Sequence, residues 1–217
     1  MSQNCEIFYK KVDTSNLEVV KKFLLEHYYP HEPLTQGSVY KGPLPEDIAF
    51  TLDCLQEDTS IGAFDNSGEM LGVLLSAEFS DTDSEWYEEE FQKDISQSWR
   101  ELLHFYKFID DTMNLFETMG VSSSCYIYAV AVAESARGRG VATELVRRAC
   151  DVARMEDYPL ISIDCSNIYT SRVAERLGMT FLNSFRIADY RNTSGQRMFN
   201  PLEPHGEFKS FAKKLKD

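Results

Sequence analysis

The most specific chemical signal in the sequence is a segment in which arginine and glycine alternate between an apolar run and an amphipathic run. Glycine lets backbone N–H groups approach a ligand closely, and the N-terminus of a helix directs unpaired N–H groups and a positive dipole toward it. Arginine side chains add charge. The segment therefore predicts a loop that binds a diphosphate group, formed by Arg137, Gly138, Arg139, Gly140, Val141, Ala142 and Thr143.

Three other interpretations of this loop are weaker. Gly138 and Gly140 are also typical of a plain turn. An Arg-Gly run can contact RNA, but the net charge of −13 repels nucleic acid and anionic lipid, so we expect neither nucleic-acid nor membrane partners. A dinucleotide-binding fingerprint needs a third glycine where Thr143 stands. The loop thus favours a local phosphate site in an acidic chain whose charge attracts cationic partners such as amines.

The elements expected around the loop place it at the junction of a strand and a helix. An apolar strand over 125–133 ends at the loop, and a helix over 141–155 keeps apolar residues at helical spacing. Further strands are expected over 5–12, 61–64, 70–78, 160–165 and 180–188, with tail strands near 197–199 and 207–214, and further helices over 17–27, 45–56, 98–119 and 169–177. This alternation predicts an α/β fold, with a mixed sheet covered by helices on both faces. No repeat or linker interrupts the chain, so residues 1–217 are expected to form one domain.

Composition argues against several kinds of site. The five cysteines form no C-x-x-C pair and mostly lie in apolar runs, so we expect reduced thiols in a cytoplasmic protein. The four histidines lack the spacing of zinc ligands, so no metal is expected. No stretch is long and apolar enough for a membrane span, and the first residues carry no secretory signal. The acidic run over 81–90 is expected to be a solvated loop or helix face.

On the residues of the loop, the chain resembles the GNAT superfamily of acetyl-CoA-dependent N-acetyltransferases. The family's diphosphate motif, Arg/Gln-x-x-Gly-x-Gly/Ala, is matched by residues 137–142, and a second signature is partly matched by Asn167 and residues 177–181. The resemblance implies a mixed, mostly antiparallel sheet that is splayed at the acetyl-CoA site. It assigns acetyl-CoA, as co-substrate, to the loop, to Asn167 and to the backbone of three strand residues, Val130, Ala131 and Val132.

Two shorter segments resemble the insect-type arylalkylamine N-acetyltransferases, which act on dopamine, serotonin and tryptamine. They are His31-Glu32-Pro33-Leu34 and the tail Pro204-His205 with Lys213-Lys214-Leu215. The resemblance implies that Glu32 is the general base. It also places three further side chains in the catalytic site, those of Ser166, Thr170 and His205.

A base is needed because an alkylamine is an ammonium ion near pH 7 and cannot attack a thioester until it loses a proton. The ordinary pKa values in water, about 4.3 for glutamate and about 10 for an amine, differ by roughly 6 units. Glu32 can therefore act if burial raises its pKa, if the pKa of the bound amine falls, or if water and His205 relay the proton. Ala174 stands where many family members carry a tyrosine that protonates the CoA thiolate, so the source of that proton stays open.

The sequence therefore predicts acetyl transfer from acetyl-CoA to the primary amine of an arylalkylamine, by direct attack in a ternary complex. Two alternatives stay open. One is a GNAT enzyme for another amine, such as a polyamine, a hydrazine or a protein N-terminus. The other is a non-catalytic acyl-CoA-binding module, which needs no base and would not depend on Glu32.

Overall fold

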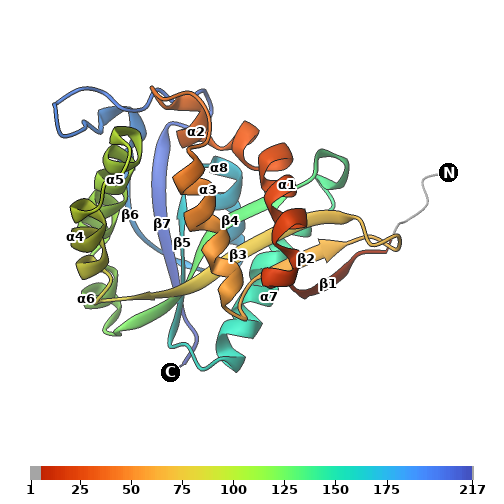
Figure 1. The fold of residues 1–217 in the computed structure, drawn as a ribbon. Coiled ribbons are helices and arrows are strands. Elements are labelled where there is room, and N and C mark those ends of the chain that lie inside the picture. The colour runs from red at the N-terminus through yellow and green to blue at the C-terminus, as the bar shows by residue number, and fades with distance from the viewer. Residues whose placement is uncertain (1–5, 217) are drawn as a thin grey trace.

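Alternating apolar residues build a single seven-stranded sheet in the computed structural model, which describes residues 6–216. The strands run in the order β1-β2-β3-β4-β5-β7-β6, and only β4 and β5 are parallel (Figure 1). Their bounds are β1 Phe8–Lys11, β2 Ile61–Phe64, β3 Met70–Ser80, β4 Ser123–Val132, β5 Leu160–Cys165, β6 Thr180–Arg186 and β7 Glu207–Lys214. The predicted mixed, mostly antiparallel sheet is confirmed.

Helices cover both faces of this sheet, as the alternation of elements predicts (Figure 1). The helices are α1 Leu17–His27, α2 Pro33–Gly37, α3 Pro45–Asp53, α4 Ser84–Gln92, α5 Gln97–Met113, α6 Leu115–Met119, α7 Val141–Met155 and α8 Ile168–Arg176. The apolar stripe of α7 is buried against one face together with α8, and α1, α3 and α5 pack on the opposite face. None of the helices in the described part of the chain combines the length and the apolar character of a membrane span.

The sheet opens between its two parallel strands. β4 and β5 pair only where Cys125–Ile127 faces Ile161–Ile163, and beyond this point the two strands separate. At the same level the register between β3 and β4 shifts, because Leu75 pairs with Ala129 whereas Ser76 pairs with Ile127. This shift leaves Tyr128 as an extra, bulged residue, and a bulge bends its strand. The expected splay of the sheet therefore lies directly before the predicted phosphate loop, residues 137–143.

Several boundaries differ from those expected. The predicted helix over 98–119 is broken at Asn114, whose left-handed backbone (φ 45°) ends α5 and starts α6. The acidic run over 81–90 contains most of α4. Residues 197–199 form only isolated bridges, and so the tail contributes a single strand, β7. The first strand begins at Phe8, while Cys5, where it was expected to start, lies outside the described residues.

Candidate active site

The loop between β4 and α7 has the backbone geometry that its glycines predict. Gly138 and Gly140 have φ angles of 76° and 81°, and a Cβ atom placed on either would meet no other atom within 4 Å. The first N–H along α7 to find a helical acceptor belongs to Glu144, which donates to the Gly140 carbonyl at 3.0 Å. The N–H groups of the first turn therefore point out of the helix end, where an anion would bind.

This loop opens onto a cleft of 830 Å³ between β4 and α8. The cleft brings together nearly all residues predicted for the site: Glu32, Val130, Ala131, Val132, Arg137, Gly138, Gly140, Val141, Ala142, Thr143, Ser166, Asn167, Thr170 and His205. Arg139 is the exception and lies outside the cleft. Its positive charge acts on the Tyr9 hydroxyl of β1, where it opposes the rise in pKa that burial causes.

The edge of β4 offers backbone donors to this cleft. The Ala133 N–H donates to the Leu71 carbonyl of β3 at 2.9 Å. Because N–H groups alternate between the two edges of a strand, those of Val132 and Val130 point to the other edge, from which β5 has separated. The N–H of Ala131 points toward β3 instead. Val130 and Val132 are therefore the two residues whose N–H groups can bind a ligand in the gap.

Glu32 is fixed by two hydrogen bonds from different parts of the chain. It is the N-cap residue of α2, where its carboxylate accepts a hydrogen bond from the Thr35 N–H. Its other oxygen accepts a hydrogen bond from the Ser166 hydroxyl at 2.7 Å, just beyond the end of β5. The side chain is only 7% exposed. Glu32 is thus a buried carboxylate held between the loop after α1 and the splayed end of the sheet.

The remaining polar residues of the cleft belong to the start of α8. Asn167 caps this helix by accepting the Tyr169 N–H at 2.8 Å. The Nδ1 atom of His205 accepts the Ile168 N–H at 3.4 Å, so a neutral His205 carries its proton on Nε2. Thr170 lines the cleft from the first turns of α8. The structure therefore brings Glu32 and Ser166 into direct contact, whereas His205 bonds to the helix.

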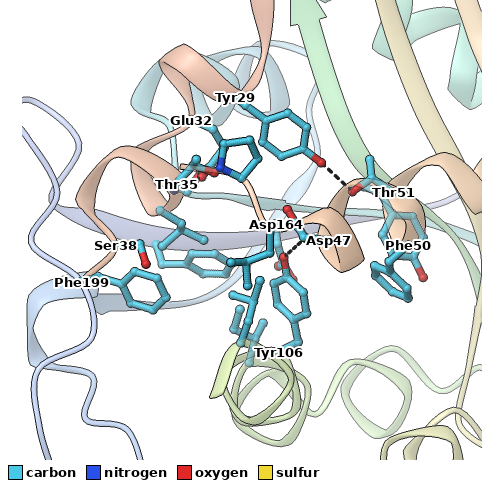
Figure 2. Close-up of a pocket in the computed structure, with 18 of the residues that line it drawn as sticks. Tyr29, Glu32, Thr35, Ser38, Asp47, Phe50, Thr51, Tyr106, Asp164 and Phe199 are labelled. Atoms are coloured by element: carbon cyan, nitrogen blue, oxygen red, sulfur yellow. Dashed lines mark hydrogen bonds between the residues drawn. The ribbon is translucent and has the colours of Figure 1, made fainter. Parts of the chain in front are cut away.

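A second cavity, of 320 Å³, begins where the first one ends. We call it the acceptor cavity; it lies on the face of the sheet covered by α3 and α5, and its walls carry many aromatic side chains, including Tyr29, Phe50, Tyr106 and Phe199 (Figure 2). Five residues line both cavities: Tyr28, Glu32, Tyr128, Asp164 and Ser166. The two cavities therefore meet at Glu32.

Three aspartates in the acceptor cavity, of which Asp47 is buried and Asp110 and Asp164 are half-buried, each accept a hydrogen bond from a tyrosine hydroxyl. Tyr106 donates to Asp47 at 2.8 Å, Tyr87 to Asp110 at 2.5 Å and Tyr126 to Asp164 at 2.9 Å. Burial raises the pKa of Asp47 and of Asp164 to about 6, and that of Asp110 to about 8.

None of these aspartates was predicted from the sequence, although two left a signal. Asp164 is the one charged residue in the apolar run over 160–165, and an uncompensated charge in such a strand is unusual. Asp110 falls on the same helical stripe as Leu103 and Tyr106, which face the core. Asp47 lies in the first turn of α3, where acidic residues are common because they interact favourably with the positive end of the helix dipole. Its sequence position therefore gives no signal of a site.

Comparisons with known proteins agree on this architecture. The model of the acetyltransferase (GNAT) family matches residues 39–179. The structure of a mosquito arylalkylamine N-acetyltransferase-like 5b protein has a TM-score of 0.91 and 24% identity, over 96% of this chain and 100% of the other. A Drosophila melanogaster polyamine N-acetyltransferase, which forms N-acetylagmatine, has a TM-score of 0.89 and 28% identity, over 96% and 100%. Arylalkylamine N-acetyltransferase 2 from Aedes aegypti has a TM-score of 0.88 and 22% identity, over 97% and 100%.

Proposed function

The chain belongs to the GNAT family of acetyltransferases, and from this premise we propose that it transfers the acetyl group of acetyl-CoA to a primary amine of a small substrate. One observation carries the proposal: the cleft beneath the phosphate loop and the acceptor cavity share a wall at Glu32 and Ser166. Two reactants that enter from opposite sides would meet at a buried carboxylate. A binding module has no need of such a junction.

The donor side of the proposal uses backbone groups. GNAT acetyltransferases use acetyl-CoA, and the open space over Gly138 and Gly140 lets a diphosphate approach the N-terminus of α7. The N–H groups of Val130 and Val132 would then bind the pantetheine arm and the thioester carbonyl. A donor aimed at that carbonyl stabilises the negative charge that develops on its oxygen when an amine attacks.

The acceptor side uses Glu32. A bound ammonium donates a proton to Glu32, directly or through the Ser166 hydroxyl, and the free amine attacks the thioester in the ternary complex. The two hydrogen bonds on Glu32 fix the direction in which its carboxylate accepts that proton. Thr170 and His205 line the same cleft and complete the proposed catalytic site.

For the identity of the amine, two classes have support. The motif resemblance and the aromatic walls of the acceptor cavity support an arylalkylamine of the dopamine, serotonin or tryptamine class. The buried aspartates of the same cavity support a polyamine or a guanidino amine, as does the 28% identity to an enzyme that forms N-acetylagmatine. The two classes differ at the end of the molecule remote from the reacting amine.

An initial-rate screen tests the proposed activity. The full chain is incubated with acetyl-CoA and about a dozen amines of both classes, and release of free CoA is followed. We expect turnover with at least one class, and no turnover with any amine would reject the proposal.

We also propose a cytoplasmic location, since Cys54, Cys125, Cys150 and Cys165 are buried free thiols.

A further inference from the structure

The acceptor cavity holds more acidic side chains than acetyl transfer needs. Its walls include five carboxylates, and none of the described residues that line it is a lysine, an arginine or a histidine. One carboxylate suffices to take the proton of the attacking amine. The five are Glu32, Asp47, Asp83, Asp110 and Asp164.

These carboxylates share one cavity, where the dielectric constant is low, and so they act on one another electrostatically. The side chains of Asp47 and Asp164 point into the cavity (Figure 2). The charge of Glu32 adds to the raised pKa of Asp47, and that of Asp164 adds to the raised pKa of Asp110, in both cases after the larger effect of burial. Buried like charges destabilise one another unless a cation lies between them. The cavity is therefore complementary to positive charge along its length.

Asp164 has an oxygen with no partner. Tyr126 donates to its Oδ2, but Oδ1 is buried and accepts no hydrogen bond from the described residues. A side-chain hydrogen bond with its cross-strand neighbour Ser210 also lowers the pKa of Asp164, so the carboxylate already has two partners from the chain, and only Oδ1 lacks one. A buried acceptor without a hydrogen bond is uncommon in folded proteins and indicates that a donor is missing. That donor would come from a ligand in the cavity.

The position of Asp164 sets a distance from the reaction centre. It precedes Ser166, the residue that donates to Glu32, by two positions at the end of β5. Two residues of strand span about 6.6 Å and place both side chains on the same face. An amine that reacts beside Glu32 can therefore reach a second carboxylate, that of Asp164, with a group at the other end of a short alkyl chain.

We infer that the acceptor amine carries a second cationic group, an ammonium or a guanidinium, which Asp110 and Asp164 bind inside the acceptor cavity. This inference rests on the proposed function, because it names the class of amine that is acetylated. The N–H groups of the second cation donate to Oδ1 of Asp164 and to Asp110. The aromatic walls fit such a molecule as well, since their faces attract cations and pack against methylene groups.

The competing occupant is a neutral aromatic head group. A catechol hydroxyl or an indole N–H can donate to Asp164, but it brings no positive charge to offset the charge of that carboxylate. An arylalkylamine would therefore leave the cavity with buried, uncompensated carboxylates. Amine pairs that differ only in the remote group separate the two cases.

The test compares such pairs on the full chain with acetyl-CoA as donor. Putrescine is matched with n-butylamine, and agmatine is compared with tyramine and dopamine. We expect kcat/KM for the two dications to exceed that for the monocations by roughly ten- to hundredfold, the value of a charge-assisted hydrogen bond to a buried carboxylate. The difference should lie mainly in KM, because the second cation takes no part in the chemistry.

Two variants locate the second subsite. In assays at pH 8.5, above the pKa values of about 8 for Asp110 and about 6 for Asp164, Asp110→Asn and Asp164→Asn keep the shape of the side chain and its acceptor for the tyrosine hydroxyl, but remove the charge. Each should lower kcat/KM for putrescine about tenfold or more and leave that for n-butylamine within about twofold. Asp111→Asn is the matched control, because the exposed Asp111 follows Asp110 and pairs with Lys107 at the surface. Acetyl-CoA affinity, measured by calorimetry, shows that each variant is folded.

The outcomes separate this inference from the proposed function. Equal kcat/KM for putrescine and n-butylamine, higher kcat/KM for dopamine than for agmatine, or equal losses for both amines in the variants would overturn the inference while the acetyltransferase proposal stands. No turnover with any amine would instead reject the proposed function itself.

Discussion

Glu32 is one of the two carboxylates, with Asp164, that line both cavities, and its replacement tests the proposed chemistry. In Glu32→Gln the amide oxygen can still accept a hydrogen bond from Thr35 or Ser166, but the side chain can no longer take a proton from the amine. We expect kcat to fall about 10²- to 10⁴-fold, the usual contribution of a general base. The dissociation constant of acetyl-CoA should stay unchanged in calorimetry.

Glu26→Gln provides the control for this change, since Glu26 lies on α1 with half of its side chain exposed and forms an ion pair with Lys22 at the surface. Unchanged kcat in Glu32→Gln would show that Glu32 is not the general base.

At the residue scale, the sequence could point only to residues whose signal is local. Glu32 belongs to a four-residue motif, whereas the aspartates of the acceptor cavity acquire their environment from distant partners. Asp47 meets a tyrosine 59 positions away, Asp164 one 38 positions away and Asp110 one 23 positions away. No local pattern in the sequence encodes such pairings.

The loop before α7 can be tested as an element. Ala at position 140 places a Cβ in the left-handed region, with a strain of roughly 1–2 kcal/mol, and puts it in the space left open for a phosphate. We expect Gly140→Ala to raise the dissociation constant of acetyl-CoA at least about tenfold in calorimetry, and to lower Tm by roughly 2–8 °C.

Gly68→Ala separates strain from binding. Gly68 lies in the hairpin turn between β2 and β3, with a φ of 86° and equally open space around its Cβ position. The two variants should lose similar thermal stability, but only Gly140→Ala should lose acetyl-CoA affinity. Equal affinity in both would contradict a diphosphate site at this loop.

Elements were predictable from the sequence where a local signal starts or ends them. The glycines before α7 and its apolar stripe gave its bounds correctly. The break at Asn114 has no glycine or proline to announce it; α6 instead turns so that Leu115 and Met119 pack against Leu160 and Ala212 of the sheet. This long-range packing overrides a helical pattern that continues through residue 119.

The stability of the whole molecule should depend on the pH through its acceptor cavity. Asp47, Asp110 and Asp164 have raised pKa values in the folded state, so the empty folded protein binds more protons than the unfolded chain between about pH 4 and pH 8. Its free energy of unfolding therefore falls as the pH rises through this window. At pH 8.5 we expect Asp110→Asn to raise the free energy of unfolding by on the order of 1–3 kcal/mol, and therefore to unfold at a higher temperature than the unaltered protein.

At pH 5 the same variant should differ little, because Asp110 is then protonated and already neutral. Thermal melts at both pH values measure the effect, with Asp111→Asn as the exposed control. A Tm difference that is the same at pH 5 and pH 8.5 would show that the charge of Asp110 is not the cause.

At the scale of the molecule, the fold class followed from the alternation of strands and helices, but the order of the sheet did not. β7 inserts between β5 and β6, so the last strand of the chain lies inside the sheet and not at its edge. Hydrophobic pattern fixes which residues form strands, whereas the choice of neighbour depends on contacts between segments far apart in the sequence.

Because β4 separates from β5, the two cavities are lined mainly by different parts of the chain. The cleft below the loop before α7 is built mainly from β4, α7 and α8. Most walls of the acceptor cavity come from the segments between α1 and α5 and from the last turns before β7. If the proposed function is correct, amine preference can therefore change by exchange of the helices and loops that line the acceptor cavity, without change to the proposed acetyl-CoA site. A chimera carrying residues 28–56 and 81–110 of a homologue, which leaves β2 and β3 in place, should inherit the homologue's choice of amine.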